Sequence, residues 1–425
     1  MKRFLCCVIL FLFCGAASSC RTTPDASAES SLEASTSAQL PRVSADTDDF
    51  PALPNLSPET VTEKHFQVSG DIFALRKMDG GFLLQYSANN SHETFLCLQD
   101  EEGRILWRHE ISASSDSVHF LGSDSIFIRT NDGFACLDQS GSVLWKTEKL
   151  GDFFDMNAAF SDHAGGAYLL GRDLLDENRQ CTLLHIDSAG KRVSQEPFRA
   201  LGNSHARFGW SGAEGEYWLS WVQANTDKHF FTKMDSAFRV LATFALPEND
   251  YPEIAFLPEA QRVFLFGQAH TTTPQKISGF LYELDEQLNK KHAVAIDGYI
   301  PKSVIQLKDK RWLVNCWDGE DAASDTVKLF NAQWREVATI RLDYSFTTLF
   351  ALDDGGFAVS GERLSPGQPY LALFVDSVRP RLDLVYERYD AKAVLICRKT
   401  YPAENSSSGY GYSSYVDGSG KIYLF

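Results

Sequence analysis

The chain has 425 residues, with 56 acidic and 40 basic side chains and a formal net charge of −16. An acidic surface repels phosphate, so the charge excludes nucleic acid as a partner and also excludes broad electrostatic adsorption to anionic lipid head groups. The sequence lacks Gly-x-Ser-x-Gly, Walker and Gly-x-Gly-x-x-Gly motifs, so no local signature indicates a hydrolase elbow or a nucleotide site.

Residues 1–19 are predicted to be a signal peptide. Lys2 and Arg3 form a basic start, an apolar run follows from Phe4 to Phe13, and small residues fill positions 15–19. This order is typical of an export signal. The apolar run of about ten residues is too short for a membrane-spanning helix, which needs roughly 20 residues.

The segment Ala17-Ser18-Ser19-Cys20 resembles the lipobox of bacterial lipoproteins, although that box usually begins with Leu. The resemblance implies cleavage before Cys20, a diacylglycerol at its sulfur with acyl chains such as palmitate, and a place in the cell membrane or the outer membrane. The alternative is ordinary secretion with cleavage nearby and a free Cys20. Without Lys2 and Arg3 the net charge is near −18, so a lipid rather than charge would hold the protein at a membrane.

Residues 20–63 are predicted to contain the lipidated Cys20 and a disordered tether. From Arg21 to Thr62 the chain is rich in Ser, Thr, Ala, Pro and acidic residues, and its few large apolar residues cannot form a core. A flexible segment of 42 residues spans about 35 Å on average, which would let a domain work clear of the membrane. A low-complexity leader without any role would have the same composition.

Residues 64–425 are predicted to form a β-propeller, because one pattern recurs at intervals of 38 to 50 residues. In each repeat an Asp or Asn follows a short apolar run and precedes a turn. About four such β-rich runs fit in each interval, which is the signature of a propeller blade. The sequence therefore predicts an all-β propeller of seven or eight four-stranded blades. The eight marks are Asp100, Asp138, Asp187, Asp235, Asp285, Asn331, Asp376 and Asp417.

Two successive repeats share a more specific motif. Gly103-Arg104-Ile105-Leu106-Trp107 and Gly141-Ser142-Val143-Leu144-Trp145 each follow one of the marks. An Asp-x-x-Gly turn followed by an aliphatic pair and Trp resembles the repeat of PQQ-like propellers. The resemblance implies that each Trp packs between neighbouring blades. The sequence offers no set of PQQ-binding residues, so no cofactor is predicted.

The last repeat is predicted to run from Ala393 to Phe425 and to be short by about one strand. A propeller closes best when its first and last blades share strands, because sharing removes open edges. We therefore expect Lys64–Val68 to join the closing blade. The count is eight blades by the marks, and seven if the final unit is only a closing fragment.

Five cysteines remain beyond residue 20, and each lies in or beside an apolar run. Cys97 and Cys136 occupy equivalent places in successive repeats, where packed sheets about 10 Å apart are too distant for a disulfide. We expect these cysteines to be small buried hydrophobic residues. The set is Cys97, Cys136, Cys181, Cys316 and Cys397.

Local motifs for chemistry are sparse. No two histidines are spaced as metal ligands, and the acid pairs Glu101-Glu102 and Asp353-Asp354 lie in repeat turns, where carboxylates are usual. The acidic stretch from Asp318 to Asp321, with Asp325, allows either a calcium site or a solvated loop. Residues 403–412 combine Tyr and Ser, as binding loops do, or form a long mobile loop. No catalytic, cofactor-binding or metal-binding residue is predicted, and Cys20 is the one predicted modification site.

The chain as a whole resembles PQQ-like propeller lipoproteins of the bacterial envelope. The resemblance implies a non-enzymatic lipoprotein whose propeller binds or scaffolds a protein partner. The alternative is an envelope enzyme or sensor that acts on glycan or peptide at the propeller axis. Acids or histidines converging from several blades would favour the enzyme, whereas an apolar or loop-covered face would favour a protein partner.

Overall fold

The computed structural model is an all-β structure, and its described residues belong to one compact unit within 60–368 and 380–425. Among these residues no helix is long and apolar enough to cross a membrane. The structure describes residues 61–66, 68, 70–88, 93–112, 118–121, 125–147, 154–173, 181–199, 204–212, 215–223, 226, 228–246, 251–257, 262–268, 277–318, 324–366, 381–403 and 412–425.

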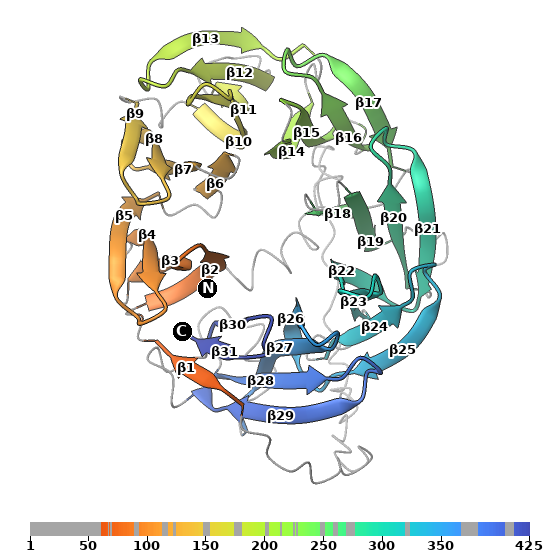
Figure 1. Ribbon diagram of the computed structural model, residues 1–425. Coiled ribbons are helices and arrows are strands. Elements are labelled where there is room, and N and C mark those ends of the chain that lie inside the picture. Colours follow the sequence, from red (N-terminus) through yellow and green to blue (C-terminus); the bar gives the residue numbers. More distant parts are fainter. Residues whose placement is uncertain are drawn as a thin grey trace, which may run out of the picture. The chain divides into compact units, whose positions relative to one another are not determined.

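The strands form eight sheets arranged as the blades of a ring (Figure 1). Seven of these sheets are four-stranded and antiparallel, with their strands in chain order. The first strand of each lies toward the centre of the ring and the fourth lies at its outside. The predicted β-propeller is therefore confirmed, with eight blades.

Blades 1 to 4 follow one another along the chain. Blade 1 consists of β2 (Gly70–Met78), β3 (Gly81–Ala88), β4 (Thr94–Asp100) and β5 (Ile105–Ile111). Blade 2 consists of β6 (Val118–Leu121), β7 (Ser125–Thr130), β8 (Gly133–Asp138) and β9 (Val143–Lys146). Blade 3 consists of β10 (Phe154–Ser161), β11 (Ala167–Asp173), β12 (Cys181–Ile186) and β13 (Arg192–Pro197). Blade 4 consists of β14 (His205–Ser211), β15 (Tyr217–Val222), β16 (His229–Met234) and β17 (Val240–Ala245).

Blades 5 to 8 complete the ring. Blade 5 consists of β18 (Tyr251–Leu257), β19 (Arg262–Gln268), β20 (Ser278–Leu284) and β21 (Lys290–Asp297). Blade 6 consists of β22 (Ile300–Gln306), β23 (Trp312–Trp317), β24 (Thr326–Phe330) and β25 (Glu336–Arg341). Blade 7 consists of β26 (Ser345–Ala351), β27 (Phe357–Leu364), β28 (Leu382–Tyr389) and β29 (Leu395–Tyr401). Blade 8 contains, within the described residues, β30 (Ser414–Val416), β31 (Ile422–Leu424) and β1 (Glu63–His65).

The recurring Asp or Asn makes the turn between the third and fourth strands of a blade. In Asp187, for example, Oδ1 accepts hydrogen bonds from the backbone N–H groups two and four residues later, at 2.9 Å each. This side chain replaces backbone partners and so stabilises a five-residue turn. The same pair of bonds recurs at Asp100, Asp235, Asp285, Asn331 and Asp390, and also at Asp417 in the turn between β30 and β31 of blade 8.

One of the eight predicted marks was wrong. Asp376 lies outside the described residues, and the corresponding turn of blade 7 is made by Asp390, between β28 and β29. As a result β29 is the fourth strand of blade 7 rather than the start of the last repeat. The apolar run before Asp376 resembles a third strand, but the third strand of the sheet is β28.

The position three residues after each mark has a positive φ, and it holds a large side chain in three blades. Phe238, Leu288 and Trp334 adopt φ of 57°, 60° and 59°. This conformation costs a non-glycine residue about 1–2 kcal/mol. The side chains offset that cost by burial against the preceding blade: Phe238 lies 4.9 Å from the Tyr168 ring, and Trp334 Nε1 donates to Glu283 Oε2 at 3.0 Å. The turn therefore also fills the interface between blades.

The hydrophobic core is divided into eight clusters, and each cluster joins two neighbouring blades. Trp107 Nε1 donates to Gln139 O of the next blade at 3.2 Å, and Trp145 Nε1 donates to Gly165 O of the next blade at 2.7 Å. The prediction that these Trp residues pack between blades is confirmed.

The five cysteines predicted to be buried are all buried and unbonded. Burial raises the pKa of the Cys97 thiol to about 12 and that of Cys181 to about 11, so both are uncharged at neutral pH. They are core residues of the blades, as expected.

The N-terminal strand closes the ring. β1 pairs in parallel with β31, with Glu63 opposite Ile422, and Phe66 N donates to Leu424 O at 2.7 Å. The Glu63 carboxylate also accepts a hydrogen bond from Tyr401 OH of blade 7 at 3.0 Å. The expected closure by the segment around residue 64 is therefore confirmed, and it covers an edge that β31 would otherwise expose.

Candidate functional site

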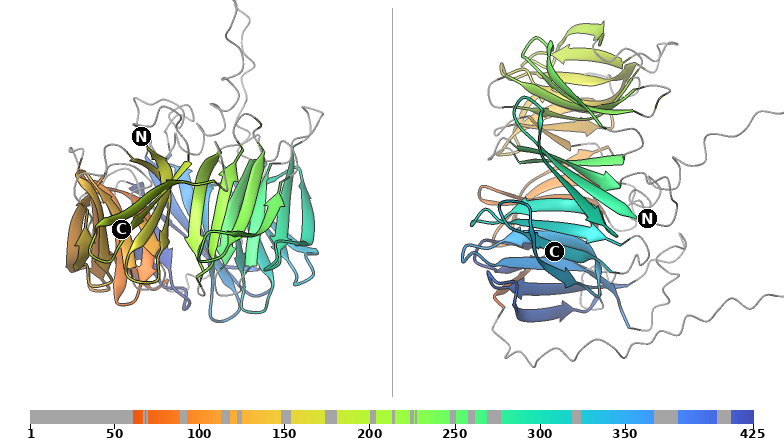
Figure 2. Two further views of the ribbon diagram at one scale, coloured as in Figure 1. Left: turned by 90° about the horizontal axis from the view of Figure 1, so that it is seen from above. Right: turned by 90° about the vertical axis from the view of Figure 1, so that its right-hand side faces the viewer.

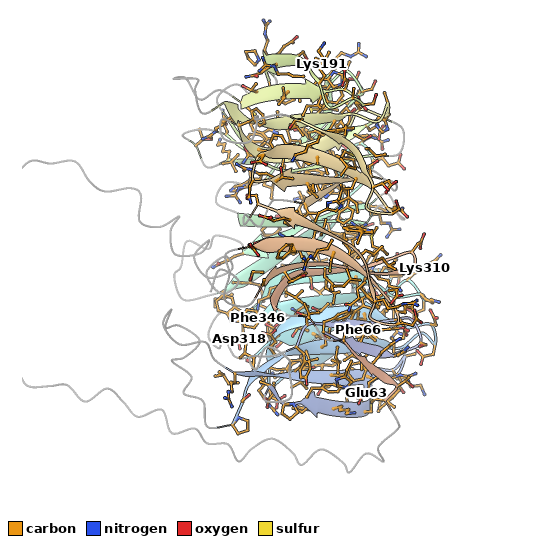
Figure 3. All side chains as sticks on the ribbon, turned by 90° about the vertical axis from the view of Figure 1, so that its left-hand side faces the viewer. Glu63, Phe66, Lys191, Lys310, Asp318 and Phe346 are labelled. Atoms are coloured by element: carbon orange, nitrogen blue, oxygen red, sulfur yellow. The ribbon has the colours of Figure 1, made fainter. Side chains whose placement is uncertain are left out.

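The ring has two unlike faces, between which the strands run (Figure 2). Links from first to second and from third to fourth strands have two to five residues and gather at one face, here called the turn face. Links from second to third strands and from blade to blade meet at the opposite face, here called the connection face, and have two to 17 residues. In Figure 3, Lys310 lies at the turn face, and Phe346 and Asp318 lie at the connection face. Differences in length between repeats are therefore concentrated in the links at the connection face.

Five inner strands carry a β-bulge near the connection face. In each case the register with the second strand shifts within the first half of the inner strand. A bulge bends the strand and redirects the side chains beside it, which is why bulges often adjoin binding sites. At the bulges the register between the first and second strands skips Phe73, Asn157, Arg207, Lys302 and the pair Phe346-Thr347.

The bulge of blade 7 holds an aromatic residue in an unfavourable conformation. Phe346 has φ of 53° and is 38% exposed, whereas Ser345 and Thr347 on either side are buried. The left-handed conformation costs about 1–2 kcal/mol, and such strained residues occur preferentially at functional sites. Phe346 is therefore the clearest candidate contact residue at the connection face.

The buried carboxylate of Asp325 fixes the backbone of this bulge by a hydrogen bond. The Asp325 side chain is fully buried, and its Oδ2 accepts the Thr347 N–H at 3.2 Å. The backbone of Asp325 bonds the chain that leads into β26, through Tyr344 O at 2.9 Å and Leu342 N at 2.9 Å. Asp325, which directly precedes β24, therefore fixes the segment that enters blade 7 through both its side chain and its backbone.

Lys302 and Asn315 complete this polar cluster. Lys302 Nζ lies 2.8 Å from Asp325 Oδ1 and compensates its charge. Asn315 Nδ2 donates to Asp325 Oδ2 at 3.4 Å and to Thr347 O at 3.3 Å. The Lys302 side chain is 37% exposed, so its ammonium group belongs both to the cluster and to the surface. Blade 6 thus supplies a rigid polar base for the Phe346 bulge of blade 7.

Two polar atoms of this cluster have no partner among the described residues. They are Asn315 Oδ1 and Thr347 Oγ1, and both are buried. Buried polar atoms are almost always hydrogen-bonded, so each has capacity for a water molecule or a ligand group. Lys302 Nζ also lies 5.7 Å from the centre of the Trp317 ring, which adds a second aromatic residue at this point.

The candidate calcium site is not assembled by the described residues. Asp318 and Asp325 are described, whereas residues 319–323 between them lie outside the described set. Asp325 is buried and already paired with Lys302, so it is not an open ligand. Within the described part of the chain, no group of three or more His, Cys, Asp and Glu side chains could hold a metal ion.

The other predicted positions are distributed as follows. Glu101 and Asp354 form separate ion pairs with Lys77 and Arg388, at 2.6 Å and 2.7 Å, in turns on different blades. Cys20, the signal peptide and most of the 20–63 segment lie outside the described residues, as do residues 404–411 of the Tyr/Ser segment. The structure therefore places the two acid pairs in turns, as the sequence indicated.

A buried carboxylate elsewhere, Glu387, joins neighbouring strands of blade 7 and the segment that enters it. Glu387 accepts hydrogen bonds from Tyr344 OH at 2.8 Å and from Tyr389 OH at 2.5 Å, and it lies 3.3 Å from Arg398. Burial and the adjacent Glu387 carboxylate raise the pKa of Tyr344 well above its usual value. This phenol therefore stays protonated and donates, so Glu387 is a structural carboxylate rather than a general base.

Sequence reasoning missed Phe346 and the role of Asp325. Phe346 lies in an ordinary apolar run, and nothing in that run predicts a positive φ. Asp325 directly precedes the β-rich run of β24. The sequence indicated it only as a candidate calcium ligand and not as a buried partner of Lys302. The missing information is the packing of blade 6 against blade 7.

Comparisons with known proteins add only the fold. No protein-family model matches the sequence, and no curated protein matches it. A structure described as the Dos1 propeller aligns with 84% of this chain and 90% of its own length, at 12% identity and a TM-score of 0.52. That likeness shows a β-propeller fold.

Two other solved structures are less similar. A protein of unknown function from Bacteroides caccae aligns with 61% of this chain and 93% of its own, at 14% identity and a TM-score of 0.33. Prolyl oligopeptidase B from Galerina marginata aligns with 83% of this chain and 54% of its own, at 10% identity and a TM-score of 0.45. Neither likeness is close enough to carry an argument about function.

Proposed function

We propose that this protein is a non-enzymatic lipoprotein of a bacterial envelope, whose propeller binds a protein partner through its connection face. Residues 1–19 direct export, Cys20 carries the lipid, and the segment up to residue 63 tethers the propeller. The sequence supports the anchor through the order of basic, apolar and small residues before Cys20. The membrane is therefore one partner, and a protein of the envelope is the other.

The observation that carries the partner-binding proposal is the exposed Phe346 on its buried polar base. Binding energy at protein interfaces is concentrated in a few rigid residues, often aromatic, near the centre of the contact. Burying a Phe side chain contributes about 1.5–3 kcal/mol. Because Phe346 is 38% exposed, a partner that covers it would contribute roughly 0.6–1.1 kcal/mol through this side chain and offset part of the free energy that the left-handed backbone costs.

The arrangement of carboxylates favours binding over catalysis. Glu387 and Asp325 are held by three or more groups each, and Glu283 accepts from Trp334 and lies 3.2 Å from Arg262. A general acid or base needs a carboxyl that reaches a substrate. These groups instead join neighbouring strands and blades.

Cross-linking and affinity capture from membranes of the native cell test the proposal. We expect the full chain to recover one envelope protein, and Phe346→Ala to reduce that recovery about tenfold or more. Val337→Ala is the matched control, because Val337 is 57% exposed but lies on β25 near the turn face. Equal loss with both variants would contradict a specific role for Phe346. If the purified protein turns over a glycan or peptide and no partner is captured, the binding proposal is wrong and the alternative, an envelope enzyme, is correct.

A further inference from the structure

The second blade leaves a groove against the first. The interval between its mark and the preceding one is 38 residues, the shortest in the chain, and β7 and β8 are joined by Asn131 and Asp132 alone. Its outer strand β9 has four residues, whereas β5 of blade 1 has seven. β5 therefore extends past the end of β9, and a cavity of about 240 Å³ opens between the two blades.

The floor of this groove is apolar and its rim is polar. Ile128, Ala135 and Leu137 are buried core residues that line it, with the exposed Val143 beside them. The polar lining consists of His109, Glu110, Thr130, Asn131, Asp132 and Lys146. Its volume is below the roughly 300–1,000 Å³ of pockets for drug-sized ligands, so it suits a single side chain or a similarly small group.

Hydrogen-bond acceptors predominate on the rim. His109 Nε2 lies 2.7 Å from Gly141 O, and because a carbonyl only accepts, Nε2 carries the hydrogen and the neutral ring keeps Nδ1 as an acceptor. Glu110 uses Oε1 to accept from Asn131 Nδ2 at 2.8 Å and keeps Oε2. Thr130 Oγ1 is buried without a partner among the described residues. Asp132 adds a second exposed carboxylate, and Lys146 is the one cation among the lining residues.

We propose that this groove binds an alkylguanidinium or alkylammonium group, carried either by a small molecule or by a basic side chain of an extended peptide. The alkyl stem would pack against the exposed Val143, above the buried Ile128 and Leu137. The cationic head would meet Glu110, Asp132 and the free acceptors, and a guanidinium group matches them well with its five donors. This site is separate from Phe346, so the proposal stands or fails independently of partner binding at the connection face.

The effect of replacing Lys146 on ligand affinity distinguishes a cationic ligand from an anionic one. Its ammonium group repels a bound cation, so Lys146→Met is expected to tighten binding by about three- to tenfold at low salt. If the groove instead bound an anion, the same substitution would weaken binding. The direction of this change therefore separates the two ligand classes.

Calorimetric titration of the full chain, purified in detergent, tests the site. Arginine is the probe and citrulline, which has the same shape without the charge, is the control ligand. Glu110→Gln with Asp132→Asn is expected to weaken arginine binding at least tenfold, and Glu102→Gln, an exposed carboxylate at the turn face, is expected to leave it unchanged. Thermal melting of each variant shows that it is folded.

Two further ligands separate the sources of the cation. Tighter binding of a capped arginine amide than of free arginine would indicate a peptide side chain, and tighter binding of a linear polyamine would indicate a small-molecule ligand. Equal binding of arginine and citrulline, unchanged affinity in the double variant, or weaker binding in Lys146→Met would each overturn the proposal.

Discussion

Replacing the buried Asp325 by Asn is the sharpest test of the polar base described above. The substitution keeps the size of the side chain but removes the charge that compensates Lys302 Nζ at 2.8 Å. It also directs an N–H group toward the Thr347 N–H or the Asn315 amide, which now donate to Asp325. Two charge-assisted hydrogen bonds are weakened or lost, each contributing about 1.5–3 kcal/mol.

The expected loss of unfolding free energy is about 2–4 kcal/mol. It stays below the sum of the two bonds because the Lys302 side chain is 37% exposed and can turn its ammonium group to water. Urea denaturation measures the change. The matched control is Asp353→Asn, since Asp353 pairs with Lys308 at the similar distance of 2.7 Å but is 66% exposed. Exposed pairs contribute about 0–1 kcal/mol, so the control should change little.

A double-mutant cycle completes the test. Lys302→Met alone leaves the Asp325 carboxylate buried without its cation and should cost more than Asp325→Asn, about 3–5 kcal/mol. The double variant should cost clearly less than the sum of the two single changes, because the two groups interact directly. If Asp325→Asn proves no more destabilising than Asp353→Asn, the claim that burial makes this pair important is refuted.

Three further outcomes are expected. Gly141→Ala should destabilise the propeller by about 2–4 kcal/mol, because the new Cβ would lie 2.3 Å from Trp107 Cγ at a φ of 80°. Gly80→Ala is the control, because the space around Gly80 is open, and it should cost only about 1–2 kcal/mol. Urea titration measures both changes. Cys20→Ser should move the protein from the membrane to the soluble fraction and abolish labelling by radioactive palmitate, whereas retention of both would remove the lipid anchor from the proposal. Desolvation raises the pKa of Glu63, but hydrogen bonds from β29 and His65 outweigh that effect and lower the pKa below 4.5. Ring closure by β1 should therefore be intact above pH 4.5 and weaken as the pH falls through the lowered pKa. Faster amide exchange at residues 63–66 would measure this weakening.

The sequence alone determined the propeller fold, because its signals are local. A carboxylate that accepts two backbone N–H groups within five residues makes the same turn wherever it occurs, so Asp187 and Asp235 could be recognised from their spacing. The failure at Asp376 has the same origin. A local pattern cannot distinguish two apolar runs that each end in Asp, and pairing within the sheet selected β28 and Asp390.

Tertiary structure decided the candidate sites. Asn315 lies on β23, Asp325 directly precedes β24 and Thr347 lies on β26, and each appears ordinary in its own segment. Their interactions are strong because the residues touch one another in a buried region of low dielectric. That region exists only once blade 6 packs on blade 7. The groove of blade 2 likewise follows from a difference in strand length between neighbours. Turn chemistry depends on a few adjacent residues, whereas burial and charge compensation depend on partners that only the closed ring brings together.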